Sequence, residues 1–112
     1  MGDRVRIVLV APVHDSGARS AMVLARLLRD AGAEVIITAP GPAPDQIVRT
    51  ALQEDAVAVA VADGTPAEVA SRVRAGLAGQ AASDVAVIVA GPDPGPDVLA
   101  EVRAAVAHAT AS

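Results

Sequence analysis

Apolar residues alternate between two spacings along the chain, and this alternation divides it into eight segments. Short runs rich in Val, Ile and Ala predict strands at 4–11, 34–39, 56–62 and 84–90. The segments after them repeat apolar positions three or four residues apart, as helices with one buried face do, at 17–32, 44–55, 65–79 and 96–109. The pattern therefore predicts four strand–helix units.

Residues with special backbone roles mark the ends of these helices. Gly32 stands where a helix C-cap belongs, and Pro44 falls in the first turn of the second helix, where a missing N–H costs least. Thr65 is expected to be the N-cap of the third helix, with Pro66 at its first position. The first helix turns Arg19, Arg26 and Arg29 outward, away from an apolar set of Met22, Val23, Ala25, Leu27 and Leu28.

Four such units joined by short linkers predict a single α/β domain over 1–112, a doubly wound parallel sheet of the flavodoxin-like or Rossmann-like kind. Right-handed crossovers favour the strand order 2-1-3-4. Ligands of such sheets bind beyond the carboxyl ends of the strands, where the winding reverses, here between the first and third strands. The loops at 12–17 and 63–66, flanked by 91–96, are therefore the candidate site.

Composition narrows the chemistry of that site. Apolar residues make up 53% of the chain, yet it has no aromatic residue, no cysteine and no lysine, since all nine basic residues are arginine. Disulfides, thiolate zinc sites, Schiff-base chemistry and a P-loop lysine are thereby excluded. A net charge of −4 and the lack of stacking aromatics argue against a nucleic-acid partner.

The chain also lacks the signals of membrane insertion or export. Its longest apolar run, 56–62, is too short to span a bilayer, so no membrane partner is expected. The N-terminal sequence MGDRVR is charged from residue 3 and leads directly into a strand, which is unlike a secretory signal. A cytoplasmic location is the expectation.

Several site chemistries fit the pattern poorly. The dinucleotide fingerprint is absent after the first strand, and a phosphate-accepting receiver domain needs a lysine that the chain lacks. A hydrolase using Ser16 and His14 lacks the G-x-S-x-G elbow. Asp15, Asp63 and Asp93 could hold a hard metal ion, although caps and turns account for all three more simply.

Three stretches carry a family resemblance: LARLLRDAGAEVIIT at 24–38, PDQIVRTALQEDAVAV at 44–59 and VIVAGPDP at 87–94. Over residues 4–103 the chain resembles the cobalamin-binding domain of methylmalonyl-CoA mutase in its stand-alone small-subunit form. The resemblance implies an isomerase subunit, cobalamin with its cobalt as cofactor, and a mutase large subunit or a homo-oligomer as partner.

The family carries Asp-x-His-x-x-Gly after the first strand, in which the histidine is the lower ligand of cobalt. Aligning His14 with that histidine requires an insertion in the first helix, because a slip of three residues turns a helix by about 300°. The ungapped register instead places Asp15 on the motif aspartate, Gly17 at the ligand position and Ser20 on the final glycine. In that register His14 is a neighbour of the motif.

Two further family signatures are altered. Ala62, Asp63 and Gly64 stand at the Ser-x-Leu position after the third strand, and Ala90–Gly91 stands for a Gly-Gly pair after the fourth. The resemblance thus assigns to the cofactor site His14, Asp15, Ser16, Gly17, Ser20, Ala62, Asp63, Gly64, Ala90 and Gly91, with His14 the candidate metal ligand and no catalytic residue. The family's fifth strand has no counterpart, which leaves the fourth strand as an open edge.

Two functional hypotheses follow. The first is a cobalamin-binding-type module of the mutase family in which the axial-histidine motif is eroded, so that corrinoid binding is weak or lost. The alternative is a non-catalytic interaction or assembly subunit that keeps the fold without the cofactor. Catalysis by this chain alone is not expected, because the radical rearrangement also needs an acyl-CoA-binding domain.

Overall fold

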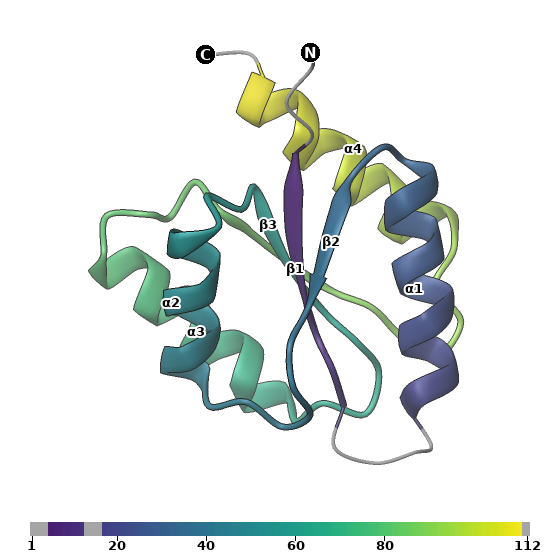
Figure 1. Cartoon of the computed structure of the whole chain (residues 1–112), viewed down its shortest axis with the longest axis horizontal. Coiled ribbons are helices and arrows are strands. Elements are labelled where there is room, and N and C mark those ends of the chain that lie inside the picture. Colours follow the sequence, from purple (N-terminus) through teal and green to yellow (C-terminus); the bar gives the residue numbers. More distant parts are fainter. Residues whose placement is uncertain (1–4, 13–16, 111–112) are drawn as a thin grey trace.

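The computed structural model describes residues 5–12 and 17–110, and Figure 1 shows a twisted sheet between two pairs of helices. Strands and helices alternate along the chain as predicted. They are β1 (Arg6–Val10), α1 (Ala18–Asp30), β2 (Glu34–Ile37), α2 (Pro44–Gln53), β3 (Ala58–Val61), α3 (Ala67–Gly79), β4 (Ala86–Val89) and α4 (Pro96–Thr110).

The four strands pair in the order β2-β1-β3-β4, and every pair is parallel, which confirms the predicted topology. β1 and β3 are the central strands, with Ile7 opposite Ala58 and Val10 opposite Val61. The helices that follow these two strands lie on opposite faces of the sheet (Figure 1). The winding direction therefore reverses between β1 and β3, where the sequence placed the candidate site.

Alternate side chains of the central strands feed two separate cores. Ile7 and Leu9 pack with α1 and α4 on one face, and Val8 and Val10 pack with α2 and α3 on the other. β3 is buried along its whole length, which explains its unbroken apolar run. No polar or charged side chain among the described residues is buried, so both cores are purely aliphatic.

The strands are shorter than the apolar runs that predicted them. Ala56, Ala62 and Ala90 are buried beside the sheet but lie outside its strands, because apolar character reports burial rather than strand pairing. The outward prediction for the three arginines of α1 is confirmed. The prediction for its apolar face is wrong at Met22 and Val23, which are 73% and 43% exposed, while Leu24 is buried in their place.

α1 ends at Asp30, and the predicted glycine, Gly32, directly follows its C-cap residue Ala31. Gly32 has φ +95° and donates to the Arg29 carbonyl at 2.9 Å, and Ala33 donates to the Leu28 carbonyl at 3.1 Å. This pair of bonds closes the helix in a Schellman motif, which requires a left-handed residue at the position of Gly32. α2 and α3 end with the same two bonds around Asp55 (φ 53°) and Ala81 (φ 57°), residues whose Cβ atoms oppose that conformation.

The start of α3 corrects a prediction. Thr65 is not its N-cap: α3 begins at Ala67, Pro66 occupies the cap position, and no side chain caps the helix. Thr65 instead closes a tight turn, donating its N–H to the Ala62 carbonyl at 3.3 Å, and its hydroxyl is buried without a partner among the described residues. Pro44, by contrast, does open α2, with the Gln46 side chain accepting the Ala43 N–H at 2.9 Å.

No helix within the described ranges is long and apolar enough to cross a bilayer.

The left-handed alanine after α3 generates a stability prediction. Ala81→Gly should stabilise the fold by about 1 kcal/mol, because glycine adopts positive φ without the Cβ conflict. The gain should appear as a rise in Tm of roughly 4 °C in a thermal melt. Ala75→Gly is the matched control: Ala75 is exposed in the interior of α3, so the same exchange should cost about 1 kcal/mol there. Equal effects of the two substitutions would contradict the assignment of strain to Ala81.

Candidate functional site

Three loops meet at the carboxyl edge of the sheet: the β1–α1 loop, the β3–α3 loop and the β4–α4 loop (Figure 1). Of the ten residues predicted for the cofactor site, His14, Asp15 and Ser16 lie outside the described residues, so their roles stay predictions. The other seven are described. They come from all three loops and from the first turn of α1.

Gly17 is the most constrained of these residues. It caps the N-terminus of α1 with ordinary dihedrals (φ −92°, ψ −8°), so its backbone conformation does not require glycine. Its surroundings do: a Cβ at this position would lie 2.7 Å from the Asp63 carbonyl oxygen and 3.0 Å from the Cβ and Cγ atoms of Pro12. Real Cβ atoms do not approach other atoms so closely, and position 17 therefore has no room for a side chain.

The partner of Gly17 is a tight turn over residues 62–65. Gly64 has φ +93° at the third position of this turn, the conformation that a type II turn demands there. A Cβ on Gly64 would lie 3.8 Å from the Gly17 Cα atom. The β1–α1 and β3–α3 loops thus pack backbone against backbone at the switch point, with half-exposed Asp63 between them.

The third loop is tied to the same cluster. Ser20, in the first turn of α1, donates its hydroxyl to the Pro92 carbonyl at 2.7 Å. Ala90 is buried and donates its N–H to the Val61 carbonyl at 2.9 Å, whereas Gly91 is exposed and a Cβ there would meet no atom within 4 Å. The structure therefore brings together the glycine and serine of the first motif and the altered residues of the other two.

Pro12 and Pro92 are parts of this cluster that the sequence did not single out. Pro12 supplies ring carbons against Gly17, and Pro92 supplies only its backbone carbonyl to Ser20. Every residue type has a backbone carbonyl, so the sequence gives no signal that identifies Pro92 as the hydrogen-bond acceptor.

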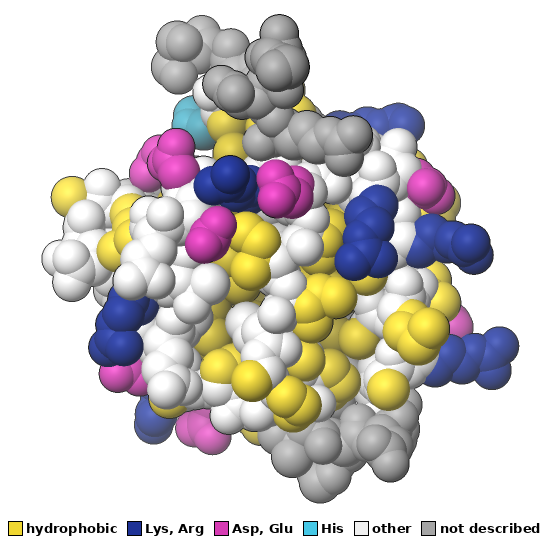
Figure 2. Space-filling model, in the orientation of Figure 1, with side chains coloured by type: hydrophobic (Ala, Val, Ile, Leu, Met, Phe, Trp, Pro, Cys, Tyr) yellow, Lys and Arg dark blue, Asp and Glu magenta, His cyan; other side chains and the backbone are white. Residues whose placement is uncertain are grey.

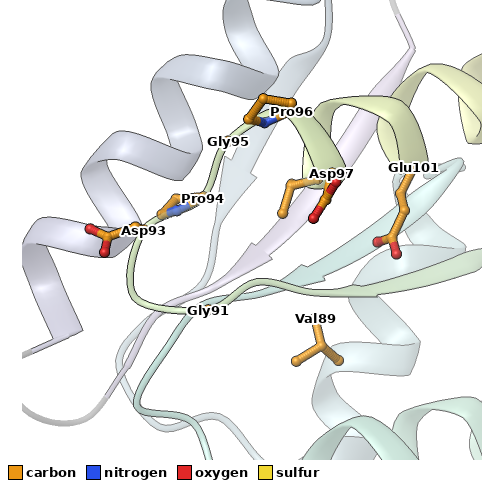
Figure 3. Close-up of a pocket in the computed structure, with 9 residues that line it drawn as sticks. Val89, Gly91, Asp93, Pro94, Gly95, Pro96, Asp97 and Glu101 are labelled. Atoms are coloured by element: carbon orange, nitrogen blue, oxygen red, sulfur yellow. The ribbon is translucent and has the colours of Figure 1, made fainter.

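An open cavity of about 280 Å³ lies beside the cluster, between the end of β4 and the first turns of α4. Figure 3 shows Asp97 and Glu101 extending from α4 toward the ribbon of β4, with Val89 on the other side of that ribbon in this view and Asp93 turned away from them. The cavity is lined by Val89, Gly91, the 93–97 segment, Val98 and Glu101. Its charged groups are all carboxylates.

The three aspartates considered as ligands of a hard metal ion are Asp15, Asp63 and Asp93. Among residues 5–12 and 17–110, no group of three His, Cys, Asp or Glu side chains is arranged to hold a metal ion. Asp63 and Asp93 are among these residues, but Asp15 is not. The described carboxylates offer no metal centre by themselves.

Comparison with known proteins identifies one relative of interest, although no protein-family model matches the chain. Over 98 residues the sequence is 34% identical to the 2-hydroxyisobutanoyl-CoA mutase small subunit of Aquincola tertiaricarbonis. The aligned residues make up 86% of this chain and 72% of that protein. The likeness therefore extends across most of the fold described above.

The packing at Gly17 generates a second prediction. Gly17→Ala should destabilise the protein by about 1–3 kcal/mol, because the new methyl group overlaps the Asp63 carbonyl and the Pro12 ring. Gly91→Ala is the matched control and should change stability by less than about 0.5 kcal/mol, since a Cβ meets only open space there. Urea unfolding followed by circular dichroism measures both. A tolerated alanine at position 17 would show that the loops are not packed as described.

Proposed function

This chain belongs to the family of acyl-CoA mutase small subunits with a cobalamin-binding-type fold, and from that membership we propose that it is a module of such a mutase whose affinity for a corrinoid is weak or lost. The fold supports the first half of this proposal. A doubly wound sheet with its switch point between β1 and β3 provides the edge at which such a module holds its ligand. The residues at that edge support the second half.

The single observation that carries the proposal is the contact at Gly17. In the ungapped register this position corresponds to the histidine that holds cobalt in the family. Here a Cβ would already lie 2.7 Å from the Asp63 carbonyl oxygen, so an imidazole has no place. The described residues therefore do not fit the lower coordination of a corrinoid, and no catalytic step through one follows from them.

Other altered positions of the first and second signatures support the same conclusion. Ser20 stands where the motif ends in glycine, and its hydroxyl is bonded to the Pro92 carbonyl rather than left free. Asp63 and Gly64 form a tight turn that packs on α1, in place of a leucine that would contact a bound nucleotide tail. Gly17 and Ser20 thus contact other residues of the same chain, Asp63 and Pro92.

Corrinoid binding is tested directly by titration with hydroxocobalamin. We expect no shift of the absorption spectrum and no cobalamin retained on the protein through gel filtration, because position 17 supplies no ligand. The measurement is repeated with His14→Ala and with His108→Ala, the chain's other histidine, which is exposed near the end of α4.

All three proteins should behave alike. A stable complex of the wild-type chain with a shifted spectrum would contradict the proposal. If that shift then disappeared in His14→Ala and persisted in His108→Ala, His14 would be the cobalt ligand, and the gapped register of the first helix would be the correct one.

A second candidate function is an assembly subunit that binds a mutase large subunit and no cofactor. The observation that favours it is the closure of the site by contacts within the chain, Gly17 on Asp63 and Ser20 on Pro92. Loops that are already held by such contacts need no ligand to order them. The fold would then serve as a docking scaffold.

Co-expression with the large subunit of an acyl-CoA mutase tests this candidate. We expect the two chains to elute together in gel filtration, and we expect the yield of the complex to be the same with and without added cobalamin, because the described residues of the site already contact one another within the chain. A complex that forms only when cobalamin is present would rule out a cofactor-independent role. Gly91→Ala, which leaves the packing intact, is the control for mutagenesis at this edge.

A further inference from the structure

The two edge strands of the sheet, β2 and β4, differ in chemistry, and the difference bears on what each can bind. At β2, the amides of Glu34 and Thr38 donate to Val5 and Leu9 of the β1 segment at 2.8 and 3.0 Å. Because backbone groups of successive strand residues point in opposite directions, the N–H and C=O groups of Val35 and Ile37 face away from β1. They form an unpaired edge within the described part of the chain.

This edge carries an apolar surface. Ile37 is 52% exposed, and Met22 is 73% exposed on α1, the helix that packs against β2. Figure 2, in the orientation of Figure 1, shows hydrophobic side chains gathered over the middle of this face, with charged ones along its rim. Soluble proteins usually protect an edge strand with charges or cover it, but after Glu34 the residues of β2 carry no charge and pair with no further strand of the described chain.

The strand itself carries no charge beyond its first residue. No charged residue occurs between Glu34 and Asp45. Glu34 itself lies 3.5 Å from Arg6, and the same arginine lies 3.5 Å from Glu54, so the acidic groups nearest the start of β2 are paired within the chain. In a chain of net charge −4, two copies can pair an uncharged strand of this kind without like-charge repulsion between the side chains of the strand.

The β4 edge has the opposite character. Val89 is as exposed as Ile37, at 53%, but the adjoining cavity is lined by Asp93, Asp97 and Glu101. No basic side chain of the described residues pairs with these carboxylates. A two-fold contact places each surface patch against its own copy, so pairing through β4 would set carboxylates against carboxylates.

We propose that the β2 edge is a self-association surface, through which two copies of this chain pair their β2 strands antiparallel about a two-fold axis at Ile36. Val35 of one copy then exchanges both backbone hydrogen bonds with Ile37 of the other, and the two sheets become one sheet of eight strands. Because the axis is perpendicular to the sheet, both α1 helices lie on the same face and flank the seam with their Met22 side chains. The proposal is independent of the corrinoid question.

The test compares two edge lysines in the full chain. Sedimentation velocity over a concentration series should show a monomer–dimer equilibrium for the wild type. Ile37→Lys should raise the dimer dissociation constant at least about tenfold, because it buries a charge at the seam. Val89→Lys is the matched control, because Val89 ends β4 as Ile37 ends β2 and the two residues are equally exposed. This variant should leave the dimer dissociation constant unchanged or lower it. Circular dichroism confirms that both variants are folded.

Hydrogen exchange supplies the readout that locates the contact. In the wild-type dimer, the outward amides of Val35 and Ile37 should exchange slowly. In the Ile37→Lys variant, the amide of Val35 should exchange rapidly. The amide of Ile36, which faces β1, should stay protected in both proteins. A wild-type chain that is monomeric throughout the series overturns the proposal. So does a dimer that Val89→Lys disrupts and Ile37→Lys does not, or a dimer in which the two outward amides remain unprotected.

Discussion

The contact between Gly17 and the Asp63 carbonyl oxygen constrains the whole carboxyl edge of the sheet. β1 and β3 are neighbours, so the loops that leave them start side by side and must turn to opposite faces. At Gly17 the two loops approach so closely that even a Cβ would not fit. That approach sets where α1 begins, and the first turn of α1 in turn places the Ser20 hydroxyl on the loop after β4.

The same contact links the fold to its function. The chain shares 34% of the aligned residues with a mutase small subunit, and our proposal is that the altered positions make contacts within the chain in place of contacts with a corrinoid. Glycine at position 17, a tight turn at 62–65 and a serine bonded to Pro92 fill the edge with intramolecular contacts. The proposed loss of the ligand is compatible with an intact architecture, because the aliphatic cores that hold the sheet lie beneath the loops.

The distribution of charge differs between the two edge strands, β2 and β4, and so does the ability of each edge to pair with another strand. Arg6 pairs with two glutamates at one end of the sheet, and the rest of β2 is apolar, whereas the carboxylates beside β4 have no such counterpart among the described residues. Neither edge is covered by the described chain, and backbone groups on an open edge favour pairing with another strand. We therefore assign the proposed self-association to the β2 edge of the sheet and not to its carboxyl edge.

The sequence alone determined the four strand–helix units, their parallel order and the switch point, because aliphatic runs and helical spacing report burial, and crossover handedness then leaves few topologies. It also located Gly32 and Pro44, whose backbone roles follow from their own covalent structure. The sequence wrongly predicted Thr65 as an N-cap and Met22 as a buried residue. The turn before α3 and the rotation of α1 about its axis cannot be predicted from the local sequence pattern. Only the tertiary structure decided that position 17 has no room for a side chain, since that depends on a carbonyl forty-six residues away, brought near by strand pairing.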